Sequence, residues 1–241
     1  MDIKNKIILV AGATGAIGEG LVRKLDQEGA RLILVSRSKE KLEKLANSLG
    51  GDVKFYVCDF LQRDQISDLI IKLSSDLDSV DILINAAGIG VYEPIEEVAI
   101  QAWDNSFAIN VTALFLITQG LLGLLGKSKS SLVLNLGSGA GRIPMCNRSV
   151  YCTAKFALRG FTLSLAEEFI DKSPNFCLIT LGSTLTEFGP LTLAEKKRLY
   201  EEGGKSYLTV DFVVDKLVNI LKLGEREVEY IIYPSDYGKD K

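Results

Sequence analysis

Short apolar runs alternate with amphipathic stretches along the whole chain. A short apolar run bounded by glycine or polar residues is typical of a buried strand, whereas apolar positions three or four residues apart are typical of a helix packed on a sheet. We therefore expect strands at residues 7–11, 31–36, 53–58, 81–85, 131–136, 176–181 and 228–233. We expect helices at residues 17–28, 39–48, 63–77, 150–170 and 210–222, and a helical region in two pieces over 95–126, the second being 103–125.

Regular alternation of strands and helices predicts an α/β fold, in which a doubly wound parallel sheet carries helices on both faces. Such a sheet binds its ligand at the carboxyl ends of the strands. No linker, repeat or low-complexity segment divides the chain, so we expect a single domain over residues 1–241. Residues 184–207 interrupt the alternation and are rich in Gly, Glu and Lys, which predicts a substrate lid there.

The composition excludes several classes of protein. The net charge of −3 comes with no basic block, so we expect no nucleic-acid partner. The longest apolar run, at residues 113–117, is too short to cross a bilayer, and the N-terminus lacks the form of a signal peptide. The four cysteines, Cys58, Cys146, Cys152 and Cys177, form no CxxC pair, and the chain has no histidine. We therefore expect no metal site, no membrane partner and a cytoplasmic protein.

The first predicted strand runs into a glycine-rich turn that opens the first helix, with the sequence Gly12-Ala13-Thr14-Gly15-Ala16-Ile17-Gly18. Glycines let the backbone turn sharply and approach a pyrophosphate, and the helix N-terminus supplies free N–H groups and a favourable dipole. After the first strand of a βαβ unit, this turn predicts that Gly12, Thr14, Gly15, Ala16, Ile17 and Gly18 bind a dinucleotide, as in a Rossmann fold.

The end of the second strand bears on the choice between NAD and NADP. An NAD site usually has an acidic residue there to hold the ribose 2′-hydroxyl. This chain has Ser36-Arg37-Ser38 instead, and Arg37 with Ser36 would receive a 2′-phosphate. We therefore expect NADP, with NAD less favoured. The alternative is that Arg37 is a solvated residue at the start of a helix.

Two further strand ends are candidates for cofactor contacts. Asp59, followed by Phe60, would accept a hydrogen bond from the adenine amine; alternatively, Asp59 caps the next turn. The next strand ends in Asn85-Ala86-Ala87, whose small residues would let the backbone pass close to the adenosine ribose.

Tyr151 and Lys155 are the candidate proton-transfer pair. Because the chain lacks histidine, another side chain must move protons near neutral pH. A lysine four residues after a tyrosine lies on the same helical face, where its charge would favour the phenolate. Ser138, at the end of the fifth strand, would share the same substrate oxygen. Taken alone, Tyr151 and Lys155 also fit a surface pair, and Ser138 an ordinary turn serine.

The glycine-rich loop, Asn85-Ala86-Ala87, Asn110, Ser138, Tyr151 and Lys155 follow one another in an order and spacing that closely resemble the short-chain dehydrogenase/reductase family, over residues 4–233. The resemblance implies that Tyr151 is the general acid or base and that Ser138 polarises the substrate oxygen. It implies that Lys155 holds the nicotinamide ribose and lowers the pKa of Tyr151. It also implies that Asn110, at a helix kink, holds a water of the proton relay; the alternative is a helix polar group satisfied by backbone.

The chain departs from the family pattern at three places. Ala11 stands where the family usually has threonine, and the position of Gly15 gives a spacing closer to the longer epimerase-type members. The usual Pro-Gly after the sixth strand is Leu181-Gly182 here. The resemblance still implies that Gly182, Thr184 and Thr186 contact the cofactor.

The family implies hydride transfer between NADP(H) and a small-molecule carbonyl or alcohol. The alternative is a non-catalytic dinucleotide sensor on the same fold. Residues 90–92, 139–146 and 184–207 would shape the substrate pocket, and an apolar substrate body is indicated by Tyr92, Ile143, Met145, Phe188 and Leu191. By resemblance we expect a homodimer or homotetramer, formed through residues 103–125 and 150–170, which are apolar over much of their circumference.

Overall fold

A computed structural model describes residues 2–236, which build one parallel sheet of seven strands in the order β3-β2-β1-β4-β5-β6-β7. The strands are β1 (Ile7–Ala11), β2 (Arg31–Ser36), β3 (Val53–Val57), β4 (Ile82–Asn85), β5 (Leu132–Leu136), β6 (Asn175–Leu181) and β7 (Glu229–Ile232). Every neighbouring pair is parallel. The predicted doubly wound α/β fold is confirmed, and the predicted strands match within two residues.

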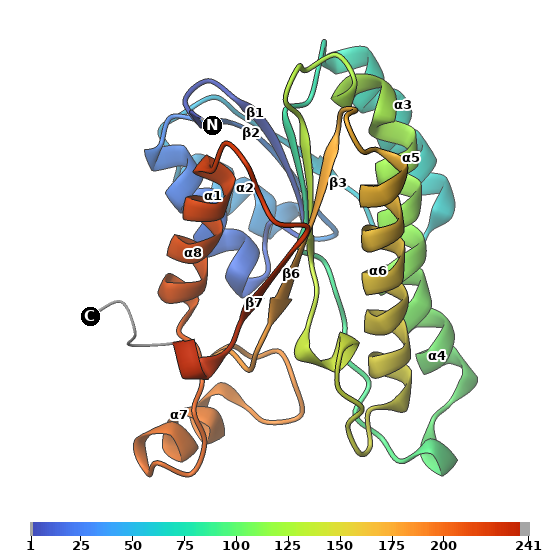
Figure 1. Cartoon of the computed structure of the whole chain (residues 1–241), viewed down its shortest axis with the longest axis vertical. Coiled ribbons are helices and arrows are strands. Elements are labelled where there is room, and N and C mark those ends of the chain that lie inside the picture. The colour runs from blue at the N-terminus through green and yellow to red at the C-terminus, as the bar shows by residue number, and fades with distance from the viewer. Residues whose placement is uncertain (1, 237–241) are drawn as a thin grey trace.

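Helices cover both faces of the sheet, as Figure 1 shows. One face carries α1 (Ala16–Gln27), α2 (Lys39–Asn47) and α8 (Val210–Lys222). The other carries α3 (Arg63–Asp76), α4 (Ile100–Phe107), α5 (Ala113–Leu125) and α6 (Ser149–Glu168). The short helix α7 (Leu193–Glu201) lies beyond the end of the sheet, at the bottom of Figure 1.

Two apolar layers hold the sheet between its helices. The inner strands β1, β2, β4, β5 and β6 are buried on both faces over almost all of their length, which explains their nearly continuous apolar sequences. Alternate residues of one strand enter opposite layers: Ile8 and Val10 pack with α1 and α8, whereas Leu9 and Ala11 pack with α3 and α5. The sheet is therefore a rigid support for the loops at its ends.

The chain reverses its direction of travel across the sheet at β1. It adds β2 and β3 on one side of β1, then returns to place β4 on the other. Loops that leave β1 and β4 therefore diverge, and a crevice opens between them at the carboxyl ends of these strands. This is where the sequence predicts the ligand.

The predicted helical region over residues 95–126 is more finely divided than expected. It comprises the single turn η1 (Ile95–Glu97), α4, the π-helical turn η2 (Ala108–Thr112) and α5. The π turn contains Asn110, so the helix is locally widened where the resemblance implies a kink.

The segment predicted as a lid contains a helix that the periodicity analysis did not predict. Thr192 caps α7 and forms a reciprocal capping box with Glu195. The pattern Thr-x-x-Glu before a helix was present in the sequence and would have located this start.

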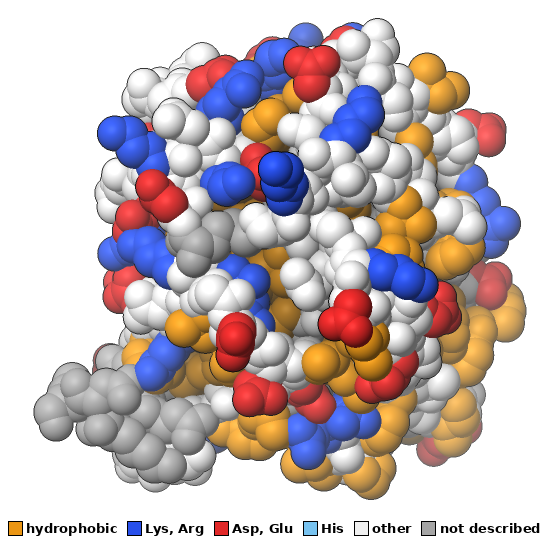
Figure 2. All heavy atoms as spheres, turned by 45° about the horizontal axis from the view of Figure 1, so that its top comes forward, with side chains coloured by type: hydrophobic (Ala, Val, Ile, Leu, Met, Phe, Trp, Pro, Cys, Tyr) orange, Lys and Arg blue, Asp and Glu red, His pale blue; other side chains and the backbone are white. Residues whose placement is uncertain are grey.

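The surface outside the crevice is mixed. Figure 2 shows charged side chains of both signs interspersed over one face, with hydrophobic side chains gathered toward its right edge. The continuous helical stretch Ile100–Leu125 is long and apolar enough to cross a membrane, by length and composition only. Half of the most apolar part of this stretch is buried inside the protein, and core helices of soluble proteins can have the same length and composition.

Candidate active site

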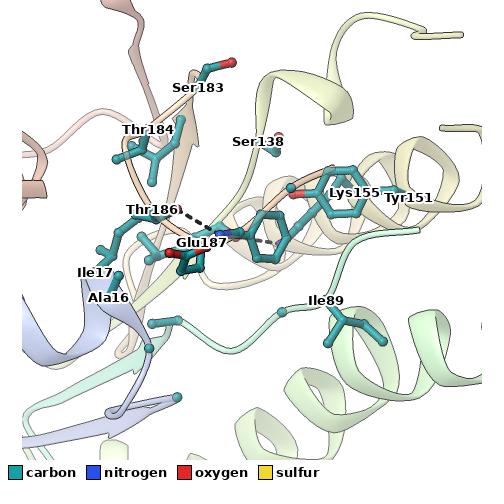
Figure 3. Close-up of a pocket in the computed structure, with 18 of the residues that line it drawn as sticks. Ala16, Ile17, Ile89, Ser138, Tyr151, Lys155, Ser183, Thr184, Thr186 and Glu187 are labelled. Atoms are coloured by element: carbon teal, nitrogen blue, oxygen red, sulfur yellow. Dashed lines mark hydrogen bonds between the residues drawn. The ribbon is translucent and has the colours of Figure 1, made fainter. Parts of the chain in front are cut away.

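A cavity of about 810 Å³ lies at the carboxyl ends of the strands. Its walls come from the glycine-rich turn after β1, the ends of β2 to β6, the start of α6 and the segment after β6. Most of the predicted site residues line it: Gly12, Thr14, Gly15, Ala16, Ile17, Gly18, Ser36, Arg37, Asp59, Phe60, Ala86, Ala87, Ser138, Tyr151, Lys155, Gly182, Thr184 and Thr186. Figure 3 shows Ala16 and Ile17 opposite Thr184 and Thr186, with Ser138, Tyr151 and Lys155 grouped nearby.

Gly12 is required by the backbone of the turn. Its φ of +90° is a conformation that L side chains rarely adopt, and a Cβ there would lie 2.6 Å from the backbone nitrogen of Ala87. A Cβ on Gly18 would collide with the carbonyl oxygen of Gly12. The turn therefore packs directly on the loop after β4. The N-terminus of α1, which follows the turn, lines the cavity and would hold a phosphate there.

The end of β2 is tied to the glycine-rich turn. The hydroxyl oxygens of Thr14 and Ser36 lie 2.6 Å apart in a hydrogen bond. The next residue, Arg37, is exposed and lines the cavity, while Ser38 caps α2 by accepting a hydrogen bond from Lys41 N–H. A hydroxyl pair beside a guanidinium suits a ribose that carries a 2′-phosphate.

Asp59 has a local structural role. Its Oδ1 accepts a hydrogen bond from the backbone N–H of Leu61 at 3.0 Å, so the alternative reading as a turn cap describes the structure. The residue still lines the cavity next to Phe60, and a contact with the cofactor stays a prediction.

Asn85 lies inside the sheet rather than on the cavity wall. Its Nδ2 donates to Asn135 Oδ1 at 2.7 Å, and Asn135 in turn donates to Thr162 at 2.8 Å. The side chain of Asn85 is completely buried, and its Oδ1 has no hydrogen-bond partner among the described residues. The structure therefore gives the Asn85 side chain a place in the sheet that joins β4, β5 and α6, and only Ala86 and Ala87 of this run line the cavity.

Asn110 is also buried and does not line the cavity. Its Nδ2 donates to the backbone carbonyls of Ile89 and Ser106, at 2.9 Å and 3.0 Å, and its Oδ1 accepts from Ile89 N–H. These bonds attach the π turn to the loop after β4. The reading of Asn110 as a polar group satisfied by backbone fits these contacts, and a bound water stays a prediction.

Tyr151 lies in the first turn of α6 and is buried. Burial raises the pKa of its phenol to about 12, opposed by a hydrogen bond from Ser138 and by the charge of Arg148. Ser138 begins the turn η3 (Gly139–Gly141), where its hydroxyl also accepts a hydrogen bond from Ala140 N–H. The serine and the tyrosine therefore point at one place in the cavity.

Lys155 lies one turn further along α6 and is 4% exposed. Its Nζ donates to the carbonyl oxygen of Leu136 at 3.0 Å and lies 5.9 Å from the centre of the Tyr151 ring. Burial lowers its own pKa to about 8. In the ligand-free chain, desolvation of the phenol outweighs the influences of Ser138 and Arg148 that lower the Tyr151 pKa, and the lowering expected from Lys155 with a bound cofactor stays a prediction.

The segment after β6 closes one side of the cavity. Thr184 pairs with Leu208 in an isolated parallel bridge, which brings the two ends of the predicted lid together. Within it, the buried ammonium of Lys196 donates to the carbonyl oxygens of Thr186 (2.7 Å) and Phe188. These bonds hold the first part of the segment against α7. The predicted pocket residues Tyr92, Ile143, Met145, Phe188 and Leu191 all line the cavity.

The sequence analysis missed Arg148, which lines the cavity, and it included Lys205 and Tyr207 only as part of the segment 184–207. Arg148 precedes Tyr151 by three residues, a spacing that brings side chains together at a helix start, and this signal would have found it. Lys205 and Tyr207 lie at the end of the predicted lid, and no local sequence signal shows that they face Arg148.

Comparison with known proteins agrees with this geometry. The family model for short chain dehydrogenase matches residues 6–198. An uncharacterized oxidoreductase of Staphylococcus epidermidis is 29% identical over 82% of this chain and 86% of its own. An NADP-dependent 3-hydroxy acid dehydrogenase of Shigella flexneri is 30% identical over 66% of this chain and 64% of its own.

A solved structure extends the likeness to the whole fold. Serine dehydrogenase in its closed form with NADP+ superposes with a TM-score of 0.84, over 94% of each chain at 25% identity. The family match, which covers most of the chain, and this fold show that the protein belongs to the short-chain dehydrogenase/reductase family and is an NAD(P)-dependent oxidoreductase.

Proposed function

We propose that the protein interconverts a carbonyl compound and its alcohol, with NADP(H) as cofactor and Tyr151 as the proton-transferring group. The observation that carries the proposal is the position of Tyr151. Its buried phenol shares one cavity with Ser138, Lys155 and the glycine-rich turn, which is a suitable cradle for a dinucleotide. A proton donor for the oxygen and a hydride source for the carbon would therefore meet at the same substrate carbonyl group.

The roles of the side chains follow from their chemistry. Bound NADP(H) would supply or accept the hydride. In oxidation, the alcohol loses its hydroxyl proton to Tyr151 and the hydride from its carbon; in reduction, the carbonyl gains both. The Ser138 hydroxyl would hold the substrate oxygen beside the phenol and stabilise its developing charge. Lys155 would bind the nicotinamide ribose with the ammonium protons that Leu136 does not take.

Discrimination between NADP and NAD depends on Ser36 and Arg37. Both line the cavity at the end of β2, where the 2′-position of the adenosine ribose lies in this fold. No acidic residue stands at this strand end to repel a 2′-phosphate. NADP is named for the Shigella relative and for the serine dehydrogenase structure, which supports the same choice.

Tyr151→Phe provides the test. The protein and the variant are assayed for NADPH oxidation against ketones and aldehydes, and for NADP+ reduction with alcohols, while NADPH binding is followed by fluorescence. The variant should keep its affinity for NADPH and lose turnover by about 10²-fold or more. A fully active variant contradicts the role of Tyr151. Binding of NADPH by both proteins with turnover by neither would instead indicate the dinucleotide sensor.

We also propose that the protein assembles through the outer surface of α4, α5 and α6. Large apolar side chains are exposed there: Trp103 (38%), Phe115 (39%) and Phe156 (44%). A second copy of the chain would cover them and form a homodimer or homotetramer. All four cysteines are free, which agrees with the reducing conditions of a cytoplasmic protein.

A further inference from the structure

Besides Arg37 and Lys155, three cationic side chains line the cavity: Arg148, Lys196 and Lys205. They differ in their partners. The ammonium of Lys196 is already held by two backbone carbonyls, and burial lowers its pKa, an effect that the carboxylate of Glu187 opposes. Lys196 therefore has a structural explanation within the lid. Arg148 and Lys205 form no ion pair with any carboxylate in the part of the chain that the structure describes.

Arg148 is held in place by the substrate pocket. Its guanidinium carbon lies 5.3 Å from the centre of the Tyr92 ring, and its Nη1 donates to the sulfur of Met145 at 3.4 Å. The Tyr92 ring is itself 5.8 Å from the Tyr151 ring. Arg148 is close enough for its charge to lower the pKa of Tyr151. A fixed guanidinium therefore stands one aromatic ring away from the reacting group.

Lys205 approaches the same place from the end of the lid. Its ammonium lies 5.0 Å from the centre of the Tyr207 ring. Partial burial and the charge of Arg148 together lower the pKa of Lys205. Lys205 is exposed, so water screens much of this repulsion, yet both cations line the cavity and an anion between them would relieve it.

Tyr207 adds an independent observation. Its side chain is 1% exposed and lines the cavity, yet its hydroxyl has no hydrogen-bond partner among the described residues. A buried hydroxyl without a partner is uncommon in a folded protein. The oxygen is closed to solvent in the ligand-free chain, so a ligand in the cavity would reach it after a shift of the lid. The charge of Arg148 acts on this phenol as well, so the hydroxyl and the two cations share one region.

We propose that Arg148, Lys205 and Tyr207 form a carboxylate subsite, and that the substrate is a hydroxy acid or the corresponding keto acid. This rests on the proposed function. A carboxylate offers two oxygens to the planar fork of a guanidinium, and it would also accept from an ammonium and a phenol. The dinucleotide phosphates are expected at the N-terminus of α1, so the cations beside Tyr151 are left for the substrate.

The test compares substrates that differ only in charge. β-Hydroxybutyrate and α-hydroxybutyrate are each assayed for NADP+ reduction beside their methyl esters, together with neutral alcohols and ketones. The wild-type protein should prefer an acid over its ester by about tenfold or more in kcat/KM. Arg148→Gln and Lys205→Gln should lower the acid-to-ester ratio of kcat/KM by a similar factor, a ratio in which any effect of Arg148 on Tyr151 that both substrates share cancels. Lys197→Gln, an exposed lysine of α7 that does not line the cavity, is the matched control and should leave this ratio unchanged.

Tyr207→Phe separates binding from folding. Because the hydroxyl has no partner in the ligand-free protein, its removal should leave the Tm unchanged or raise it, while KM for the acid still rises. A fall in Tm with an unchanged acid-to-ester ratio would show that the hydroxyl serves the fold and would remove it from the subsite.

The remaining outcomes separate the two proposals. Turnover of esters or neutral alcohols without preference for acids overturns the carboxylate subsite and leaves the proposed function standing. Weaker NADPH binding by Arg148→Gln, with an unchanged acid-to-ester ratio, shows that the cation serves the cofactor and overturns the subsite in the same way. Absence of hydride transfer with every substrate overturns the proposed function, and the subsite with it.

Discussion

Replacement of Lys155 by methionine should stabilise the ligand-free protein at pH 7. The ammonium is buried, and it donates a hydrogen bond to a neutral group, the carbonyl oxygen of Leu136. The folded protein lowers the pKa of this group from 10.5 to about 8. At 1.36 kcal/mol per unit, the charged lysine destabilises the folded state by about 3 kcal/mol at pH 7. Loss of its hydrogen bond costs about 1 kcal/mol, so the net gain is about 2 kcal/mol.

The pH dependence gives the sharper test. Because the folded pKa lies below the unfolded one, the unfolded state binds more protons between pH 8 and pH 10.5, and stability rises with pH in that window. Below about pH 8 the full penalty is present, and between pH 7 and pH 9.5 the wild-type protein should regain about 2 kcal/mol relative to Lys155→Met. The advantage of the variant should therefore almost vanish at the higher pH.

Thermal unfolding followed by circular dichroism measures this difference, on both proteins without cofactor. For a chain of this length, 2 kcal/mol corresponds to a rise in Tm of about 4–8 °C at pH 7. Lys197→Met, on the exposed face of α7, serves as the control and should stay within about 0.5 kcal/mol of wild type at both pH values. A Lys155→Met protein that is less stable at pH 7, or an advantage that does not shrink with pH, refutes the reasoning.

Three other predictions concern the cofactor end and the outer surface. Arg37→Asp should weaken the binding of NADPH by about tenfold or more and the binding of NADH far less, with both dissociation constants measured by fluorescence. Equal losses of affinity for the two cofactors would argue against a 2′-phosphate site. Gly12→Ala should lower the Tm, since a positive φ costs an L residue about 1–2 kcal/mol and the new Cβ would lie 2.6 Å from the Ala87 nitrogen. Gly123→Ala in α5 is the control: a Cβ there meets nothing within 4 Å, so this variant should be slightly more stable than wild type. Phe115→Glu should reduce the mass measured by light scattering if the outer helices pair, and an unchanged oligomer places the interface elsewhere.

The sheet could be predicted from the sequence because each strand carries its own signal. A buried parallel strand must be apolar on both faces, so its limits are visible in the sequence without knowledge of its neighbours. The glycine-rich turn is equally local: the steric need for glycine at Gly12 arises from the turn and from the loop after β4, both of which the spacing had placed. These features depend on short-range geometry, which the sequence records directly.

The Asn85 side chain has a role that the sequence did not reveal. In the structure it pairs with Asn135, fifty residues later and directly opposite it in the register of β4 and β5. The pairing of the strands decides which hydrogen-bond partner such a side chain finds, and the sequence alone does not give the register of that pairing.

Tyr151 and Lys155 show how far local reasoning reaches, because the lowered pKa expected for Tyr151 depends on a cofactor charge as well and stays a prediction. Their spacing correctly puts both residues on one helical face, and from this the sequence analysis expects a lowered phenol pKa. The pKa of Tyr151 also depends on how deeply the phenol is buried and on where the Lys155 ammonium points. The ammonium donates to the carbonyl of Leu136, and burial raises the pKa of Tyr151 to about 12. Opposite charges lower a phenol pKa only if their attraction exceeds the loss of hydration. In the ligand-free chain it does not, so a phenolate near neutral pH requires additional positive charge at the site. Arg148, whose charge lowers this pKa, stands beside the pocket where the substrate would add a negative charge of its own. A carboxylate bound at Arg148 would weaken its effect on Tyr151, so the acid substrate should favour the protonated phenol, the form needed to reduce a carbonyl.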